Sequence, residues 1–253
     1  MNEAQLVRVD DDESVRILTL DNPDTMNGLS AAMREQFMAA FERAAADETV
    51  AAIVVTGAGG NFSAGGDISA MAGQTTQERV ELLRRIQEFM LTWPTLPKPV
   101  LVAVEGAAAG GGVAMTLAAD WAVAASDARF VAGWLAIALA PDMGAAWWAP
   151  RVLGPKRTFD WLHGARIDAT QALATGLVSA VCDPGTALET AVKRAKQIVA
   201  LPAAGRTAAK RMIRAAMQSD ATAFAAFELA TMAELIDSED HRAAVQAFLD
   251  RKR

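Results

Sequence analysis

The chain has 253 residues, of which 52% are hydrophobic and 21% are charged, and its formal net charge at pH 7 is −6. This composition supports a packed core and excludes a disordered chain, and the acidic balance argues against nucleic acid as the main partner, because phosphate binding requires a basic surface. Since the first residues contain no secretory signal and no window approaches the roughly 20 apolar residues of a membrane span, we expect a cytoplasmic protein.

The first predicted elements are a strand, a turn and a helix. Residues Val15–Leu20 have the pattern of a strand, and the turn signal Asp21–Asp24 ends it. Ser30 stands where its side chain can accept a hydrogen bond from the first amides of a helix. The apolar face of that helix repeats at helical spacing, at Met33, Phe37, Phe41 and Ala44.

The alternation of strand and helix continues through the middle of the chain. Strand patterns occupy residues 50–56 and 100–104, and a helix with one apolar face is predicted between them, over 75–93. The glycine triplet Gly110–Gly112 follows the second of these strands and precedes a predicted helix over 113–120. Strands and helices that alternate in this way are typical of the α/β class.

Strand patterns disappear from Gly185 onward. Three helical runs are predicted there, over 186–200, 203–218 and 221–250, with a break in the last near Ser238. We therefore divide the chain into a β/α core over residues 1–184, which would hold the site, and a C-terminal helical region over 185–253. The helical region carries more apolar side chains than a helical hairpin needs, which predicts an oligomer interface.

The glycine triplet predicts a site for a negatively charged oxygen. The first N–H groups of a helix have no partner within the helix and lie at the positive end of its dipole. Where side chains are absent, a ligand oxygen can approach these amides, which favours an anion or a developing oxyanion. Close packing of the helix against the strand is the alternative explanation. The spacing of a dinucleotide-binding or P-loop motif is absent.

A second small-residue segment follows the strand at 50–56 and reads Phe62-Ser63-Ala64-Gly65-Gly66-Asp67-Ile68. Two such loops can each offer one N–H group to the same oxygen. Together with the triplet, this segment resembles the crotonase family, which comprises the enoyl-CoA hydratases and isomerases. The resemblance extends over nearly the whole chain and includes Asn27 after an Asn-Pro-Asp turn and Lys98-Pro99-Val100 before the third strand.

The resemblance implies a fold, a site and partners. The fold would be a stacked β-β-α superhelix with a C-terminal helical oligomerisation region, assembled as a homotrimer or homohexamer. The amides of Ala64 and Gly111 would form an oxyanion hole for the thioester carbonyl of an acyl-CoA substrate. The substrate would also be lined by Gly65, Gly66, Asp67, Ile68 and Gly112. Capping of the following helix is an alternative role for Asp67. No cofactor is expected, since coenzyme A arrives as part of the substrate.

The acid–base positions decide which reaction the resemblance implies. Hydratases of the family carry two glutamates, and here those positions are Ala114 and Trp134, so we expect hydratase activity to be weak or absent. Family members that shift double bonds, such as the ring-epoxide isomerases of phenylacetyl-CoA breakdown, place an aspartate at the position of Asp142. One carboxylate can remove a proton beside the thioester and return it at another carbon. We therefore expect an isomerase with Asp142 as the proton shuttle, and capping of the next helix is the alternative role for Asp142.

Other functions remain open for the same residues. An acyl-CoA dehalogenase or hydrolase with Asp142 as the nucleophile is one alternative. Acyl-CoA dehalogenases of the family pair a tryptophan at the position of Trp134 with a nucleophilic aspartate at that of Asp142. They also use a histidine on the preceding helix, where this chain has Gln87, which can face the pocket but cannot take a proton from water. Trp134 can also act as a lid over the acyl group, and a non-catalytic acyl-CoA binder is a further alternative. His163 and His241 are too few and too far apart for a metal site.

Overall fold

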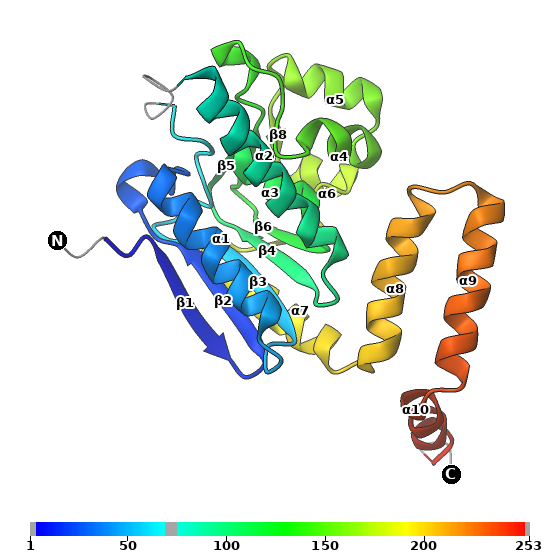
Figure 1. Ribbon diagram of the computed structural model, residues 1–253. Helices are drawn as coiled ribbons and strands as arrows, with labels where there is room; N and C mark the ends of the chain where they lie inside the picture. Colours follow the sequence, from blue (N-terminus) through cyan, green and yellow to red (C-terminus); the bar gives the residue numbers. More distant parts are fainter. Residues whose placement is uncertain (1–3, 69–74, 251–253) are drawn as a thin grey trace.

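The computed structural model describes residues 4–68 and 75–250, and its centre is a six-stranded sheet (Figure 1). The strand order is β1-β2-β3-β4-β6-β9, in which β1 and β2 are antiparallel and the other neighbours are parallel. These strands span Val7–Asp12, Val15–Leu20, Ala52–Gly57, Val100–Val104, Trp121–Ala125 and Ala180–Cys182. The α/β class predicted from the sequence is confirmed.

Helices cover both faces of this sheet, because its central strands are apolar on both sides. Every residue of β4 is buried, and only the last residue of β3 is partly exposed. On one face, α1 (Ala31–Ala46) and α2 (Thr76–Thr92) close the larger part of the core. On the other face, α7 (Ala187–Val199) packs against a second set of strand side chains, Val15, Ala52, Val54, Leu101, Ala103 and Val123.

Aromatic side chains join α1 to α2 and position the helices that flank the site. Phe41 stacks on Trp93 with ring centroids 5.1 Å apart, and Phe89 meets Phe41 edge-on at 5.2 Å. Offset and edge-on pairs of this kind add to the free energy gained from apolar burial. The start of α1 is as predicted, since the Oγ of Ser30 accepts a hydrogen bond from the amide of Met33.

A smaller sheet leads into the glycine triplet. β5 (Ala107–Ala109) pairs with β7 (Arg129–Val131) in parallel, and β8 (Ile167–Asp168) adds to β7 in the antiparallel direction. α3 follows β5 directly and spans Gly111–Ala118, so it begins two residues earlier than predicted and its first turn contains two glycines. The remaining short helices are α4 (Ala145–Val152), α5 (Pro155–Leu162) and α6 (Ala169–Thr175), with 3-10 turns at Pro23–Thr25, Trp93–Thr95 and Leu135–Ile137.

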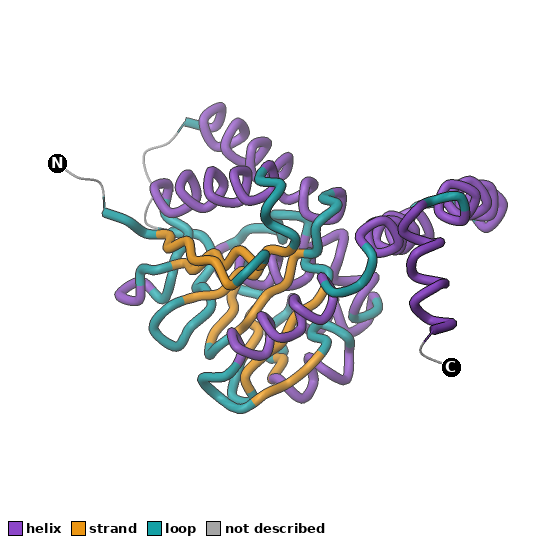
Figure 2. Tube along the Cα trace, turned by 90° about the horizontal axis from the view of Figure 1, so that it is seen from below, coloured by secondary structure: helices purple, strands orange, loops and turns teal. Residues whose placement is uncertain are grey.

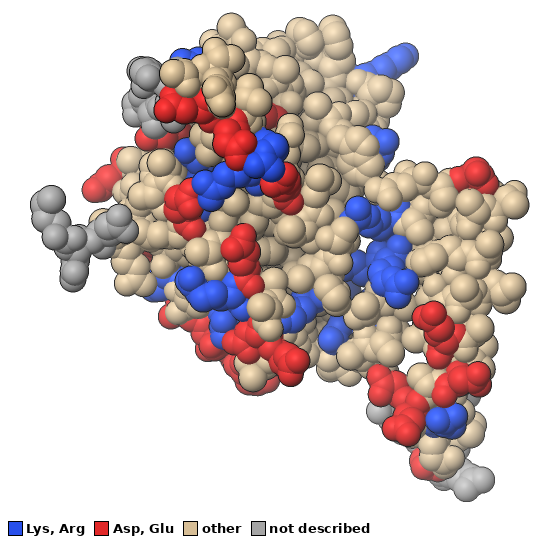
Figure 3. All heavy atoms as spheres, in the orientation of Figure 1, with Lys and Arg blue, Asp and Glu red and all other residues tan. Residues whose placement is uncertain are grey.

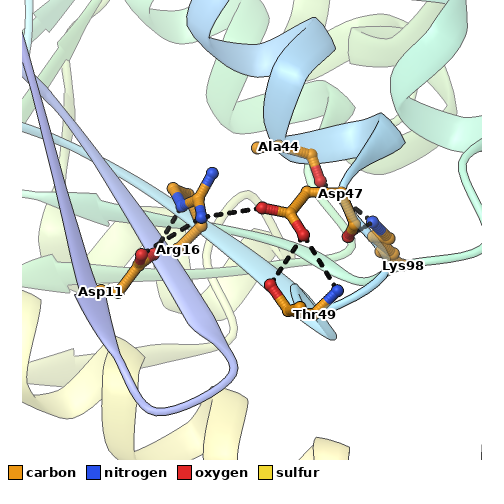
Figure 4. A network of polar contacts seen from close by, with 6 residues as sticks. All are labelled: Asp11, Arg16, Ala44, Asp47, Thr49 and Lys98. Carbon is orange, nitrogen blue, oxygen red and sulfur yellow. Dashed lines mark hydrogen bonds and ion pairs between the residues drawn. The ribbon is translucent and has the colours of Figure 1, made fainter.

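A polar network fixes the end of α1 to the edge of the sheet (Figure 4). The Nζ of Lys98 donates to the carbonyl oxygens of Ala44 at 3.0 Å and Asp47 at 2.6 Å. These are carbonyls that the last turn of a helix leaves without partners. The carboxylate of Asp47 in turn accepts hydrogen bonds from Thr49 and from Arg16 on β2. Burial lowers the pKa of Lys98.

The last three helices leave the body of the molecule as an arm, which both views show separated from the sheet (Figures 1 and 2). The arm consists of α8 (Ala203–Ala216), α9 (Ala221–Ile236) and α10 (Glu239–Asp250), with the predicted break at Ser238. α7 packs on the sheet, although the sequence analysis placed it in the C-terminal helical region that begins at residue 185. The chain leaves the core only after this helix. On the face seen in Figure 3, Lys and Arg side chains gather along α8, whereas α9 is mostly uncharged.

Candidate active site

The two glycine-containing loops lie side by side. The segment after β3 pairs with β5, since the amide of Ser63 donates to the carbonyl of Ala107 at 3.1 Å and the amide of Ala109 donates to the carbonyl of Ser63 at 2.9 Å. Gly65 has a φ of +86°, and a Cβ there would lie 2.6 Å from the Ala109 oxygen and 3.2 Å from the Gly111 nitrogen. Only glycine allows this approach, so the loops come together at the start of α3 as predicted.

Asn27 holds the first of these loops in place. Its side chain is fully buried, and its Nδ2 donates to the carbonyl oxygens of Ala58 at 2.9 Å and Asn61 at 2.8 Å. Its Oδ1 accepts from the amide of Asn22 at 2.9 Å, and the hydroxyl of Ser63 donates to its carbonyl at 2.9 Å. All polar atoms of this buried amide are therefore used to connect two loops. Its φ of +56° is one that asparagine tolerates better than most residues.

The free amides of the site differ in one position from the prediction. The N–H of Ala64 donates to the carbonyl of Met26 at 2.8 Å, so it cannot serve a ligand oxygen without breaking that bond. Among the described residues, the amides of Gly66 and Gly111 have no acceptor, and Gly111 is the first residue of α3, where no internal partner exists. The prediction that Ala64 offers a free amide is wrong for this structure, and the free amide in this loop belongs to Gly66, which follows the glycine that packs against Gly111.

Trp134 holds the carboxylate of Asp142. The indole Nε1 donates to Oδ1 of Asp142 at 2.8 Å, and Trp134 is only 5% exposed while Asp142 is half-buried. The second oxygen, Oδ2, has no partner within the described part of the chain. Gly144 is the N-cap of α4 and no side chain caps that helix, so the alternative in which Asp142 caps it is wrong. The carboxylate has one oxygen fixed and one available.

Met143 connects this carboxylate to the start of α3. Its Sδ lies 2.9 Å from the position that a Cβ on Gly111 would take, and Cδ1 of Leu29 lies at the same distance. Its φ is +52°, a left-handed conformation that costs free energy for a residue with a side chain. The residue next to Asp142 therefore packs against the glycine whose amide is free, which brings the segment that carries the carboxylate to the start of α3.

The other residues predicted to line the substrate are Gly112, Asp67 and Ile68. A Cβ on Gly112 would lie 2.9 Å from the carbonyl oxygen of Ser63, so this glycine is needed for the approach of the two loops. Ile68 is 57% exposed at the end of the described segment. α2 is capped by Thr75 through a capping box with its own first turn, so Asp67 is not the cap of that helix. Roles of Asp67 and Ile68 in binding CoA stay predictions.

Gln87 is not brought to these residues by any contact that the described structure shows. It lies exposed on α2, as do Val80, which is 60% exposed, and Leu83, which is 40% exposed. The buried face of α2 is formed instead by Ile86, Phe89 and Met90. The face of α2 that carries Gln87 is thus the outer face in this structure, so Gln87, which the sequence allowed to face the pocket, points away from the core.

A small apolar cavity of about 20 Å³ lies next to Met143 and contains one charged wall residue, Arg34, which the sequence analysis did not single out. The other walls are Leu29, Phe37, Met38, Ile86, Phe89, Met115 and Met143. Burial lowers the pKa of Arg34, and its Nε is buried without a hydrogen-bond partner. A cation in the first turn of a helix, where the dipole disfavours it, is the sequence signal that would have pointed to this residue.

Two other kinds of site are absent from the described residues, a metal centre and a membrane-spanning helix. No group of three or more His, Cys, Asp or Glu side chains is placed there to hold a metal ion. His163 stacks on Phe159 at a centroid distance of 4.0 Å and its Nδ1 donates to the Phe159 carbonyl at 2.7 Å, and His241 is exposed on α10. None of the described helices combines the length and the apolar character needed to cross a membrane.

Comparisons with known proteins were made on the whole chain. The family model for enoyl-CoA hydratase/isomerase matches residues 10–253. A probable enoyl-CoA hydratase of Rhodobacter capsulatus is 36% identical over 97% of this chain and 95% of its own length. A 1,2-epoxyphenylacetyl-CoA isomerase of Escherichia coli is 30% identical over 95% and 94% of the two chains. The crystal structure of an enoyl-CoA hydratase from Polaromonas superposes with a TM-score of 0.92 at 29% identity, covering 97% of each chain.

Proposed function

The chain belongs to the enoyl-CoA hydratase/isomerase family, and we propose that within it this protein is an isomerase that moves the double bond of an unsaturated acyl-CoA. The observation that carries this proposal is the single half-free carboxylate of Asp142, which is held by Trp134 and precedes Met143, the residue that packs against Gly111. One carboxylate with one available oxygen is sufficient to take a proton from one carbon and return it to another.

The substrate is held through its thioester carbonyl. The carbonyl oxygen accepts hydrogen bonds from the amides of Gly66 and Gly111, which have no other acceptor in the described structure. Gly111 adds the positive end of the α3 dipole. These donors are fixed by backbone packing before the substrate binds, so they stabilise a developing negative charge without reorganisation. Coenzyme A itself supplies no chemistry and serves as the handle of the acyl group.

Proton transfer then needs only Asp142. Its Oδ2 removes a proton from the carbon whose acidity the bound thioester increases, and the electron pair moves to the carbonyl oxygen to form an enolate. The amides of Gly66 and Gly111 hold that oxyanion. When the enolate collapses, the protonated carboxyl returns the proton to a different carbon, and the double bond has moved. The carboxylate is regenerated, and no water and no second acid are consumed.

Hydration is disfavoured by the same set of residues. Addition of water requires a base for the water and an acid for the carbon. At the two positions where the resemblance places glutamates, Ala114 is fully buried in α3 and Trp134 donates to Asp142. Neither side chain can transfer a proton in this reaction. We therefore propose that hydratase activity is weak or absent, although several relatives carry that name.

A second candidate is favoured by the hydrogen bond between Trp134 and Asp142. The same pair is expected where an aspartate attacks carbon and forms a covalent intermediate, as in the dehalogenases described above. A nucleophilic role requires a further base to activate water for hydrolysis of the intermediate. Gln87 stands where those enzymes use a histidine, and it is exposed on α2. This absence makes isomerisation the better supported function.

The test uses 3-enoyl-CoA and 2-enoyl-CoA as separate substrates, each followed by chromatography of the products. Isomerisation gives the other positional isomer from each, whereas abundant 3-hydroxyacyl-CoA would contradict the proposal. Mass spectrometry of the protein after rapid quench distinguishes the second candidate, which leaves an adduct on Asp142. Binding of acyl-CoA without any product would identify a non-catalytic binder.

We also propose that the protein works as a trimer or as a dimer of trimers. The arm presents apolar side chains that a monomer leaves in water: Leu229 is 73% exposed, Ile236 is 53% exposed and Phe248 is 58% exposed. Surfaces of this kind are common in subunit contacts. The arm extends away from the body in Figure 2, which leaves these faces available to a second copy.

A further inference from the structure

Arg34 begins a series of hydrogen-bonded peptide groups at the start of α1. Its Nη1 donates to the carbonyl oxygen of Leu29 at 2.5 Å. The N–H of the same peptide group belongs to Ser30, and it donates to the carbonyl of Gly28 at 2.9 Å. The positive charge therefore lies at one end of two peptide groups whose dipoles are connected head to tail.

The series continues into the oxyanion site. The peptide group of the Gly28 carbonyl has its N–H on Leu29, and that N–H donates to the carbonyl of Gly65 at 2.7 Å. The Gly65 carbonyl shares its peptide group with the N–H of Gly66, which has no acceptor among the described residues. The last member of the series is thus a free amide on the residue after Gly65, the glycine that packs against Gly111. We call these three connected peptide groups, 28–29, 29–30 and 65–66, the peptide relay.

Burial of Arg34 disfavours its positive charge more than the neighbouring acids favour it. The residue lies in the first turn of α1, where the helix dipole disfavours positive charge. The cavity beside it is otherwise apolar, and its Nε is buried without a partner, which destabilises the folded state. Asp67 and Glu35 are the acids whose charges favour the cation, and desolvation outweighs them. An apolar residue of the same length would fit this wall of the cavity.

We propose that Arg34 is a positioning residue of the oxyanion site, which polarises the peptide relay so that the amide of Gly66 becomes a stronger and better oriented donor to the thioester oxygen. Hydrogen bonds in series strengthen one another by about 10–30% per bond, and more where an ionised group starts the series. This inference rests on the proposed function only in requiring a thioester carbonyl at Gly66 and Gly111, and not in requiring isomerisation.

The test measures carbonyl polarisation directly, with a saturated acyl-CoA that carries ¹³C at the thioester carbonyl. Isotope-edited infrared spectra of the bound ligand report the shift of the carbonyl stretch to lower frequency relative to water. Arg34→Met removes both the charge and the donor, and Arg34→Gln keeps a donor but removes the charge. We expect each to lose roughly a tenth to a third of the wild-type shift. Arg34→Lys restores it, and Arg43→Met, an exposed arginine of the same helix, leaves it unchanged.

Kinetics with the isomerisable substrate supply the second readout. We expect kcat to fall about two- to tenfold in Arg34→Met, with KM changed less than about twofold, since the effect is on the oxyanion and not on CoA binding. A merely structural role predicts instead a lower thermal midpoint and a full carbonyl shift in the molecules that remain folded. A full shift in Arg34→Gln would therefore overturn the inference, even if Arg34→Met failed to fold.

Failure of the proposed function looks different in the same experiments. If the wild-type protein shifts the carbonyl and the shift depends on Arg34, but no double bond moves, the inference stands and isomerisation is wrong. If the wild-type protein binds the acyl-CoA without any shift, no oxyanion site exists and both the inference and the proposed function are overturned.

Discussion

The indole of Trp134 and the carboxylate of Asp142 are joined by a hydrogen bond of 2.8 Å, made by a side chain that is 5% exposed. The tryptophan cannot follow the carboxylate into solvent, because it is packed in the core. The carboxylate therefore keeps one oxygen on the indole, and its other oxygen has no partner among the described residues. The sequence allowed Asp142 to be either a helix cap or a reacting group. The structure excludes the cap, because Gly144 is the N-cap of α4 and no side chain caps that helix.

Asp142→Asn should abolish double-bond migration while acyl-CoA binding persists. The amide keeps the size of the side chain and a possible bond to Trp134, but it cannot accept a proton from carbon. We expect kcat to fall by about 10²–10⁴. Product analysis and calorimetric titration with a saturated acyl-CoA check the two halves of the statement. Asp160→Asn, on an exposed position of α5, is the matched control. A variant with wild-type turnover would remove Asp142 from the mechanism.

Trp134→Phe tests the positioning of the carboxylate. Phenylalanine fills most of the same space but has no N–H, so Asp142 loses its partner and rotates more freely. A hydrogen bond to an ionised group is worth about 1.5–3 kcal/mol, and misplacement of a reacting group lowers kcat more than it raises KM. We expect kcat to fall about tenfold with KM changed less than threefold. Trp147→Phe, on the next helix, should leave both constants near the wild type.

The glycines of the chain differ in what an added methyl group would meet. In Gly112→Ala the Cβ would lie 2.9 Å from the carbonyl oxygen of Ser63, a backbone atom that cannot move aside. We expect the free energy of unfolding to fall by about 1–3 kcal/mol. In Gly205→Ala, on α8, the Cβ meets nothing within 4 Å, and we expect a gain of about 0.5–1 kcal/mol. Urea unfolding of both variants measures the contrast, and equal effects would refute it.

Lys210 anchors α8 to the body, since its Nζ donates to Asp120 at 2.6 Å and to the carbonyls of Trp93 and Lys98. Burial raises the pKa of Asp120, and the attraction of Lys210 opposes that rise. Lys210→Met therefore raises the pKa of Asp120 further. We expect the variant to be about 2 kcal/mol less stable than the wild type at pH 7, because a partly buried carboxylate loses its partner.

The pH dependence of this loss has a definite sign. A carboxyl group whose pKa is higher in the folded than in the unfolded protein binds a proton that the unfolded chain does not, so folding is favoured as the pH falls from the folded pKa towards about 4. The stability difference between Lys210→Met and the wild type should therefore shrink between pH 7 and pH 4.5. Denaturant unfolding at a series of pH values measures it. A difference that stays constant would show that the charge of Asp120 is not the cause.

Leu229→Glu tests the proposed assembly. The side chain is 73% exposed on α9, so a charge there costs the isolated chain little, but it would be buried in a subunit contact. We expect sedimentation velocity to show monomers for the variant and a trimer or hexamer for the wild type, with similar thermal midpoints for the core. Phe159→Glu, at 65% exposure on the body, is the control. A variant that sediments as the wild type would exclude this face of α9 from the interface.

Local patterns were sufficient for most of the fold. The cap at Ser30, the apolar face that ends at Ala44 and the strand before the glycine triplet all stand where the sequence predicts them. These signals depend only on residues close together in the chain. The first strand of the sheet was missed, because Val7–Asp12 is an edge strand in which four of the six residues are exposed and no apolar alternation is needed.

The sequence by itself predicted that two glycine-containing loops come together at the start of a helix, because small residues follow two buried strands, and the resemblance to the family added Asp142 to them. The tertiary structure alone decided which amides are free. Ala64 and Gly66 have the same kind of backbone N–H, and only the fold shows that Met26 occupies the first and leaves the second. It also decided that Gln87 faces outward and that Arg34 is connected to the site, because both depend on how helices rotate against neighbours far away in the chain. Hydrogen bonds between distant peptide groups leave no pattern in the order of side chains.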